Sequence, residues 1–146
     1  HLMIAGWGTE ASSITDITMR SITRRKVNII GPVSESEKKH LLSKAWVFVN
    51  PSIGEGWGIS VIEANLYGAP VVAFDVAGLS ESIRHGQTGY LSKNENDFVD
   101  NICRILINKA LRLRFSKNAK KWANTFNWET AATNSLAVIK SVVKNG

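Results

Sequence analysis

The fold is decided by residues 50–64, which read Asn-Pro-Ser-Ile-Gly-Glu-Gly-Trp-Gly-Ile-Ser-Val-Ile-Glu-Ala. The apolar run 46–49 before them predicts a short buried strand, and the proline that follows ends it because proline has no N–H for a ladder. Three alternating glycines then predict a tight turn. Beyond the turn, Ile59, Ile62 and Leu66 have the i, i+3, i+7 spacing of one helix face. The stretch therefore predicts a strand, a glycine-rich turn and a helix.

The glycine-rich turn has the features of an anion-binding site. Glycine allows positive φ and lets the backbone come close to a ligand. The first N–H groups of a helix have no partner within the helix, and they form the positive end of the helix dipole. The glycine-rich turn and the start of the helix that follows it are therefore a candidate site for a phosphate group.

Two carboxylates frame this turn. Glu55 lies just before the predicted helix, and Glu63 lies eight residues further along the chain, inside it. Carboxylates only accept hydrogen bonds, so they suit the many hydroxyl donors of a sugar. On spacing alone, a structural interpretation is favoured, in which Glu55 complements the helix dipole and Glu63 is an exposed helix residue.

Motifs spread over nearly the whole chain occur in one register. They read, in chain order, Gly6-Trp7-Gly8, Asn28-Ile29-Ile30-Gly31-Pro32-Val33, Pro51-Ser52-x-x-Glu55-Gly56-Trp57-Gly58, Glu63-Ala64, Gly68-Ala69-Pro70-Val71-Val72-Ala73, Ala77-Gly78-Leu79-Ser80-Glu81 and Gly86-Gln87-Thr88-Gly89-Tyr90-Leu91. With the Glu-x7-Glu spacing of Glu55 and Glu63, they resemble the retaining glycosyltransferases of family 4, which have the GT-B fold. One glycine-rich turn is a weak signal, whereas several blocks in the same order are specific.

The resemblance implies a nucleotide-sugar donor as substrate and gives each motif residue a role. Glu55 would be the catalytic residue, in contact with the hydroxyls of the donor sugar, and Glu63 would accept hydrogen bonds from the ribose. The other implied donor-binding residues are Gly56, Trp57, Gly58 and Ile59 at the sugar and diphosphate, Val33, Ser34 and Glu35 beside the base, and Gly6 and Gly8 near the base and ribose. Lys38 is added as a residue that could reach the nucleotide, although an exposed helix lysine explains it equally well.

The implied reaction is transfer of a hexose with retention at the anomeric carbon. Trp57 replaces the family's usual phenylalanine, and the Ala77–Glu81 motif departs from the usual Gly-Gly-x-Pro-Glu. The chain also lacks an opening strand and turn whose arginine and lysine grip the diphosphate in the family. We therefore expect residues 1–146 to be the donor-binding C-terminal domain of such an enzyme, truncated at its N-terminal side and inactive alone. An acceptor glycan or lipid would bind to the missing N-terminal domain.

The order of strand and helix patterns predicts the fold class. Strands are expected at 1–6, 26–30, 46–49, 70–74 and 89–91, with helical patterns between them and a helical segment after residue 92. Ser34 and Glu37 form a capping box at the start of one helix. This alternation indicates an α/β domain, with a Rossmann-like doubly wound parallel sheet covered by helices on both faces.

Composition and charge narrow the function classes. The 146 residues carry a net charge of +6 and one cysteine, Cys103, which we expect to pack within a helix in a reducing compartment. The basic residues are scattered rather than aligned with aromatics, which argues against nucleic acid. A basic group on the helix around residues 112–121 is expected to be a solvated face, and peripheral contact with a membrane stays open. The expected location is cytoplasmic, with the cytoplasmic membrane face as the alternative.

No metal or other cofactor is expected, because Glu55 and Glu63 lack the companion ligands that metal sites need. The main alternative function is a binding module that holds a nucleotide or phosphosugar without catalysis. A nucleotide-sugar epimerase fits the Glu-x7-Glu spacing less well. A response-regulator-like domain would need clustered aspartates at strand ends, which the sequence does not offer.

Overall fold

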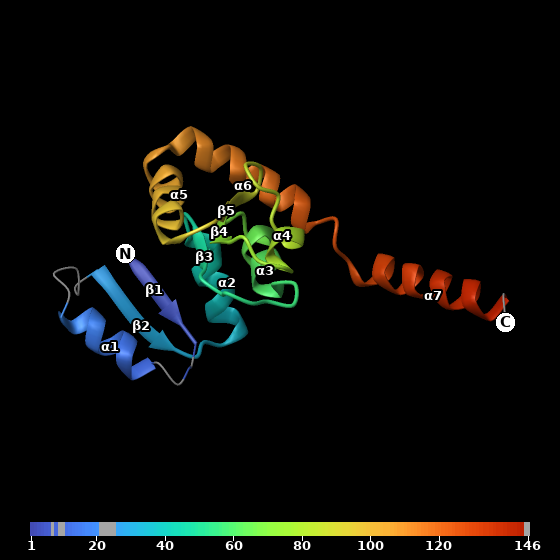
Figure 1. The fold of residues 1–146 in the computed structure, drawn as a ribbon, viewed down its shortest axis with the longest axis horizontal. Coiled ribbons are helices and arrows are strands. Elements are labelled where there is room, and N and C mark those ends of the chain that lie inside the picture. The colour runs from blue at the N-terminus through green and yellow to red at the C-terminus, as the bar shows by residue number, and fades with distance from the viewer. Residues whose placement is uncertain (7, 9–10, 21–25, 145–146) are drawn as a thin grey trace. The chain divides into compact units, whose positions relative to one another are not determined.

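The computed structural model describes residues 1–6, 8, 11–20 and 26–144, and its contacts divide the chain into two compact units, His1–Leu41 and Leu42–Gly146. Figure 1 labels the helices and strands of both units. Every strand pair in the described ranges is parallel, and helices lie between consecutive strands. The protein is therefore an α/β protein, as its sequence predicts.

The first unit contains a two-stranded parallel sheet. Strand β1 (Leu2–Ala5) pairs with β2 (Val27–Gly31), and helix α1 (Ala11–Arg20) lies between them in the chain. A parallel pair needs such a crossover connection. Trp7 of the first glycine motif lies outside the described residues. Helix α2 (Glu35–Lys44) follows β2 and continues into the second unit.

The second unit is built on a three-stranded parallel sheet with the order β3-β4-β5. Its strands are β3 (Phe48–Asn50), β4 (Val71–Phe74) and β5 (Gly89–Ser92). Helices α3 (Ile59–Leu66) and α4 (Leu79–Ser82) connect the strands, and α5 (Glu95–Ile107), α6 (Lys109–Ala123) and α7 (Trp128–Lys144) follow them.

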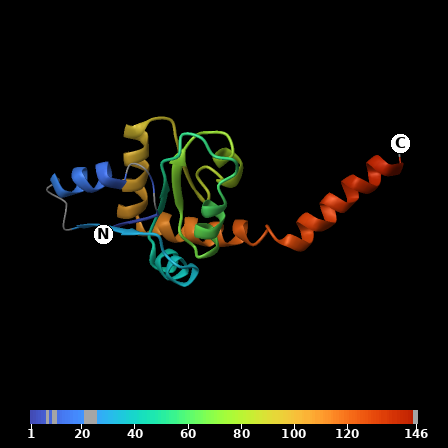
Figure 2. The same cartoon turned by 90° about the horizontal axis from the view of Figure 1, so that it is seen from below.

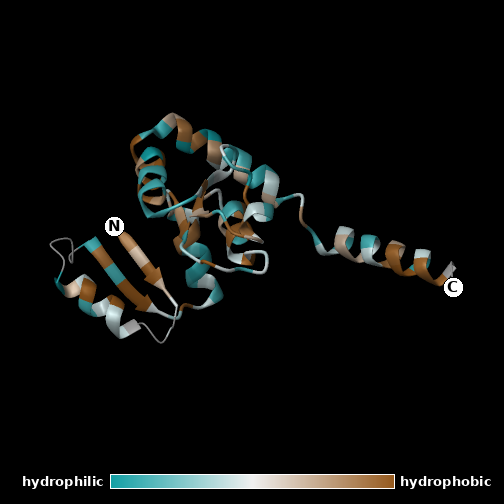
Figure 3. Ribbon diagram, viewed as in Figure 1, coloured by the Kyte–Doolittle hydropathy of each residue, from teal (hydrophilic) through white to brown (hydrophobic). Residues whose placement is uncertain are grey.

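Strand β4 is buried on both faces, which explains why its sequence is apolar without alternation. Val71 and Ala73 pack against residues of α3 and α4, whereas Val72 packs on the other side with Ile105 of α5 and Phe115 of α6. Figure 2 shows α3 and α5 on opposite sides of the strands, and Figure 3 shows the hydrophobic colouring of the strands between them. The predicted arrangement of helices on both faces of a parallel sheet is confirmed in this unit.

The apolar face predicted for the helix after the glycine-rich turn is wrong. Ile59 and Leu66 are 70% and 48% exposed, and the residues that α3 buries are Val61, Ala64 and Asn65. Both sets have helical spacing, so periodicity alone could not choose between them. The buried face includes Asn65, and because polar residues are usually exposed, the sequence did not indicate this face.

The prediction that Cys103 packs within a helix is half right. It lies on α5, but it is exposed, because this helix buries Asn101 and Ile105 and Cys103 lies between them in sequence, on the other side of the helix.

In the part of the chain that the structure describes, no helix is long and apolar enough to cross a membrane.

Candidate functional site: the glycine-rich turn before α3

The predicted turn leads from β3 into α3 and ends at Gly58. This residue is the N-cap of α3 and has left-handed backbone angles, φ 80° and ψ 60°, which favour glycine. Its carbonyl accepts a hydrogen bond of 2.9 Å from the N–H of Val61, and no side chain caps the first turn. The first N–H groups of α3 are therefore left for water or for a ligand, as the anion-site hypothesis requires.

Gly58 is buried, although it lies in a turn between a strand and a helix. A Cβ atom at this position would lie 2.7 Å from Cδ2 of Leu79 and 3.3 Å from Cγ2 of Val61. The close contact arises because α4 packs directly against the start of α3. A glycine is thus required here by backbone conformation and by packing, before any ligand is considered.

A second glycine supports the turn from the next loop. Gly78, between β4 and α4, has φ 83°, and a Cβ atom on it would overlap the backbone carbonyls of Glu55 and Gly56. The Ala77–Glu81 motif, although it departs from the family pattern, therefore fixes the position of the glycine-rich turn. The two loops lie next to each other at the carboxyl ends of β3 and β4, where open α/β sheets bind ligands.

The two predicted carboxylates differ in their surroundings. Glu55 is half-buried, and its carboxylate has no hydrogen-bond or ion-pair partner among the described residues. Glu63 is half-buried on α3 and already interacts with another group of the protein. Glu55 is therefore the carboxylate that is available to accept hydrogen bonds from a ligand.

An aromatic chain anchors the turn to the end of α6, and sequence reasoning missed it. The ring of Trp57 lies edge-on to Phe126, with centroids 4.9 Å apart, and Phe126 lies edge-on to Trp122 at 4.6 Å. The indole N–H of Trp122 donates to the carbonyl of Ser82 at 2.8 Å, and the guanidinium of Arg84 lies 3.9 Å from the Trp122 ring. Nothing local in the sequence indicates that Phe126 contacts Trp57, because the two residues are far apart in the chain.

The residues predicted beside the base lie in the first unit. Ser34 and Glu37 form the predicted capping box: the N–H and hydroxyl of Ser34 donate to Glu37 at 2.8 and 2.7 Å, and the N–H of Glu37 donates to Ser34 at 3.3 Å. These bonds to Ser34 hold the pKa of Glu37 below its ordinary value. Lys38 forms an ion pair of 2.9 Å with Glu35, so each of these two side chains has a protein partner.

The structure thus gathers the predicted site residues into two groups. One group surrounds the first turn of α3 and comprises Glu55, Gly56, Trp57, Gly58, Ile59 and Glu63. The other group lies in the first unit, with Val33, Ser34, Glu35 and Lys38 at the start of α2 and with Gly6 and Gly8 after β1. Gly6 has φ 128° and donates to the carbonyl of Gly31 at 2.8 Å.

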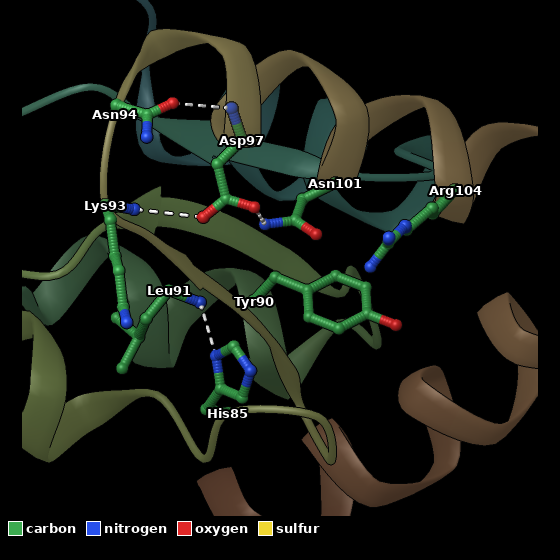
Figure 4. A pocket seen from close by; sticks show the side chains of 8 residues that line it. All are labelled: His85, Tyr90, Leu91, Lys93, Asn94, Asp97, Asn101 and Arg104. Atoms are coloured by element: carbon green, nitrogen blue, oxygen red, sulfur yellow. Dashed lines mark hydrogen bonds between the residues drawn. The ribbon is translucent and has the colours of Figure 1, made fainter.

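A separate depression of about 520 Å³ lies beside β5 and α5, and none of the predicted site residues lines it (Figure 4). Both carboxylate oxygens of Asp97 there accept protein hydrogen bonds, from the N–H of Lys93 at 3.0 Å and from the amide of Asn101 at 3.2 Å. These hydrogen bonds stabilise the N-terminal end of α5. Within the described ranges, no group of three or more His, Cys, Asp or Glu residues is placed to hold a metal ion.

The parallel sheet with helices on both faces defines an α/β domain, and the uncapped N-terminus of α3 at the carboxyl edge of the sheet is a candidate anion site. The chain belongs to the family described as "Glycosyl transferases group 1", whose sequence pattern matches residues 1–122. Among relatives, it is 34% identical over 116 residues to the D-inositol 3-phosphate glycosyltransferase of Nocardioides sp.. The match covers 78% of this chain and 25% of that protein.

The same family membership appears in solved structures with the GT-B fold. A mutant form of TarM from S. aureus, in complex with fondaparinux, alpha-GlcNAc-glycerol and UDP, is similar with a TM-score of 0.84 and 29% identity over 92% of this chain. Sucrose-phosphate synthase from Thermosynechococcus elongatus is similar with a TM-score of 0.85 and 25% identity over 99% of this chain. This chain spans 28% and 39% of the lengths of those two proteins.

Proposed function

We propose that this chain binds the nucleotide-sugar donor of a retaining glycosyltransferase. The observation that carries the proposal is the uncapped start of α3 at Gly58, with the half-buried, unpartnered carboxylate of Glu55 beside it, in a chain of the glycosyl transferase group 1 family. TarM, to which the chain is similar, was crystallised with UDP. A uridine diphosphate is therefore the first nucleotide to test.

In this proposal the protein stabilises the leaving diphosphate and orients the sugar. The N–H groups from Gly56 to Ile59 bind the diphosphate, where negative charge grows as the bond to the sugar breaks. Glu55 binds hydroxyls of the donor hexose and Glu63 those of the ribose. In the first unit, the resemblance assigns Val33, Ser34 and Glu35 to the base and Gly6 and Gly8 to the base and ribose, and Lys38 is added as a residue that could reach the nucleotide. No metal ion or other cofactor takes part.

We further propose that the chain is the donor-binding C-terminal domain of its enzyme. The proposal is supported by the family match over residues 1–122 and by the share of the relatives' length that the chain spans, 25% for the Nocardioides protein. The acceptor, a glycan or lipid, would bind to an N-terminal domain, at the cytoplasmic side of a membrane.

Steady-state kinetics of the complete enzyme test these roles. Glu55→Gln should lower kcat on the order of 10- to 100-fold, because a hydrogen bond to a charged group contributes about 1.5–3 kcal/mol and Glu55 acts at the reacting sugar. Glu63→Gln should mainly raise KM for the donor, because the ribose does not react. Glu95→Gln, on the exposed first turn of α5, is the matched control.

The kinetic outcomes separate the competing functions. Equal effects of the Glu55 and Glu63 changes on both parameters would contradict the assigned roles. Binding of UDP without transfer of any hexose by the complete protein would favour the non-catalytic nucleotide-binding module. Absence of UDP binding in the wild-type chain would contradict the donor site itself.

A further inference from the structure

Helix α6 concentrates the positive charge of the molecule. The whole chain has 18 basic and 12 acidic residues. Six of the basic residues lie on α6, which contains no acidic residue: Lys109, Arg112, Arg114, Lys117, Lys120 and Lys121. This single helix therefore carries as many charges as the net +6 of the chain.

Most of these cations share the exposed face of α6. The helix buries Phe115, Ala119 and Ala123, which repeat every four residues. Lys117 and Lys121 repeat in the same way on the opposite face, with the other exposed cations around them. Arg112 has a structural role, since it donates to the carbonyls of Ile105 and Leu106 at 3.0 and 2.9 Å and stacks on Trp46. The guanidinium of Arg114 lies 5.6 Å from the Phe115 ring, and the side-chain carbons of Lys120 lie against Gly68.

The stability of the helix explains only part of this charge. Lys120 and Lys121 lie in its last turn, where the helix dipole favours cations, but the other four basic residues lie earlier in the helix. None of the six cations forms an ion pair among the described residues. Lys117 and Lys121 are like charges four residues apart, which destabilises an isolated helix by about 0.2–0.5 kcal/mol. The first turn of α6 also lacks the acidic residues that the helix dipole favours. An anionic partner outside the described residues would offset both costs.

Exposed apolar side chains within this basic surface indicate the kind of partner. Leu113 is 59% exposed and lies four residues from Lys109 and from Lys117, between cations of the same face. Ile107, 83% exposed, lies at the end of α5, two residues before α6 begins. Nucleic acid or an acidic protein surface would attract the cations but leave these two apolar side chains in water. A lipid bilayer attracts the cations through its anionic head groups and buries the apolar side chains among its acyl chains.

We propose that the exposed face of α6 (Lys109, Leu113, Arg114, Lys117, Lys120 and Lys121), with Ile107 beside it, binds the surface of an anionic membrane. The surface is separate from the glycine-rich turn, so the proposal does not depend on the donor site. The proposal assigns a defined surface to the peripheral membrane contact that the charge pattern of the sequence allowed. Binding should weaken with added salt, because the charges are exposed and are screened.

Co-sedimentation of the chain with vesicles tests the proposal. Wild-type protein should bind vesicles of phosphatidylglycerol and phosphatidylcholine and not vesicles of phosphatidylcholine alone. The triple change Arg114→Gln, Lys117→Gln and Lys121→Gln should weaken this binding on the order of 100-fold, from the usual contribution of a basic residue near an anionic surface. The matched control changes Lys39, Lys44 and Lys140, which are exposed on other helices, to Gln, and should retain most of the binding.

A second variant distinguishes a bilayer from other polyanions. Leu113→Gln keeps every charge and should weaken vesicle binding several-fold while leaving any binding to duplex DNA unchanged. Thermal melts of all variants check that each is folded. The proposal is overturned by no vesicle binding in low salt, by equal losses in the two triple variants, or by tight DNA binding combined with an unchanged Leu113→Gln variant.

Discussion

Gly58 is the residue on which both the fold and the candidate site depend. Its positive φ and the 2.7 Å approach of a Cβ atom to Leu79 predict that Gly58→Ala destabilises the protein by about 1–3 kcal/mol. Gly54→Ala is the matched control in the same loop, because a Cβ atom there has no neighbour within 4 Å. Denaturant unfolding of both variants gives the difference, and equal midpoints would show that the backbone of Gly58 relaxes without cost.

Asn65 is a second residue for which the structure makes a specific prediction. It is fully buried on α3, and neither atom of its amide has a hydrogen-bond partner within the described ranges. Asn65→Leu has a similar shape and removes the unsatisfied group, so it should stabilise the chain by about 1–3 kcal/mol. Asn101→Leu should do the opposite, since the buried Asn101 amide donates to Ser92 at 3.0 Å. Destabilisation by Asn65→Leu would mean that its amide is satisfied in the folded protein.

At the residue scale, the sequence pointed to Gly58 and Glu55 through a local pattern and a family resemblance, and their roles at a donor site stay predictions. Their surroundings were harder to predict. The burial of Gly58 was not predictable, because it depends on Leu79, which helix α3, strand β4 and a turn separate from it in the chain. The burial of Asn65 was not predictable either, since polarity normally indicates exposure.

At the scale of elements, interactions within a few residues were predictable and distant ones were not. The Ser34–Glu37 capping box was read from the sequence and is present with three hydrogen bonds. All five strands were placed within a few residues of their actual positions. The contact of Trp57 with Phe126 was not predicted, because no sequence rule relates a loop to a residue so far along the chain.

The aromatic chain should control the position of the glycine-rich turn. Phe126→Ala removes the ring between Trp57 and Trp122, and such aromatic pairs contribute about 0.5–1.5 kcal/mol each beyond their burial. We expect UDP affinity to fall several-fold, while Phe126→Tyr keeps the ring and the affinity. Trp128→Ala is the control, because that neighbouring aromatic side chain is 90% exposed. Calorimetric titration with UDP measures the affinity of each variant. Equal UDP affinity for Phe126→Ala and wild type would contradict a positioning role.

At the scale of the whole molecule, the sequence predicted the α/β class and the parallel strands. In the described residues the strands form a two-stranded sheet in one unit and a three-stranded sheet in the other. This division was not predictable, because sequence patterns locate each strand locally and do not show which strands pair.

The last prediction follows from the proposed domain division. The chain alone should bind UDP weakly and transfer no sugar, because residues 1–146 do not contain the basic strand and turn that the resemblance implies, and each lost charged contact costs about 1.5–3 kcal/mol. Extension of the chain at its N-terminal side to include that strand and turn should tighten UDP binding, since it would supply the arginine and lysine. Transfer should appear only when the acceptor domain is also present. Titration and a transfer assay on the three lengths test each step, and sugar transfer by residues 1–146 alone would show that the proposed domain division is wrong.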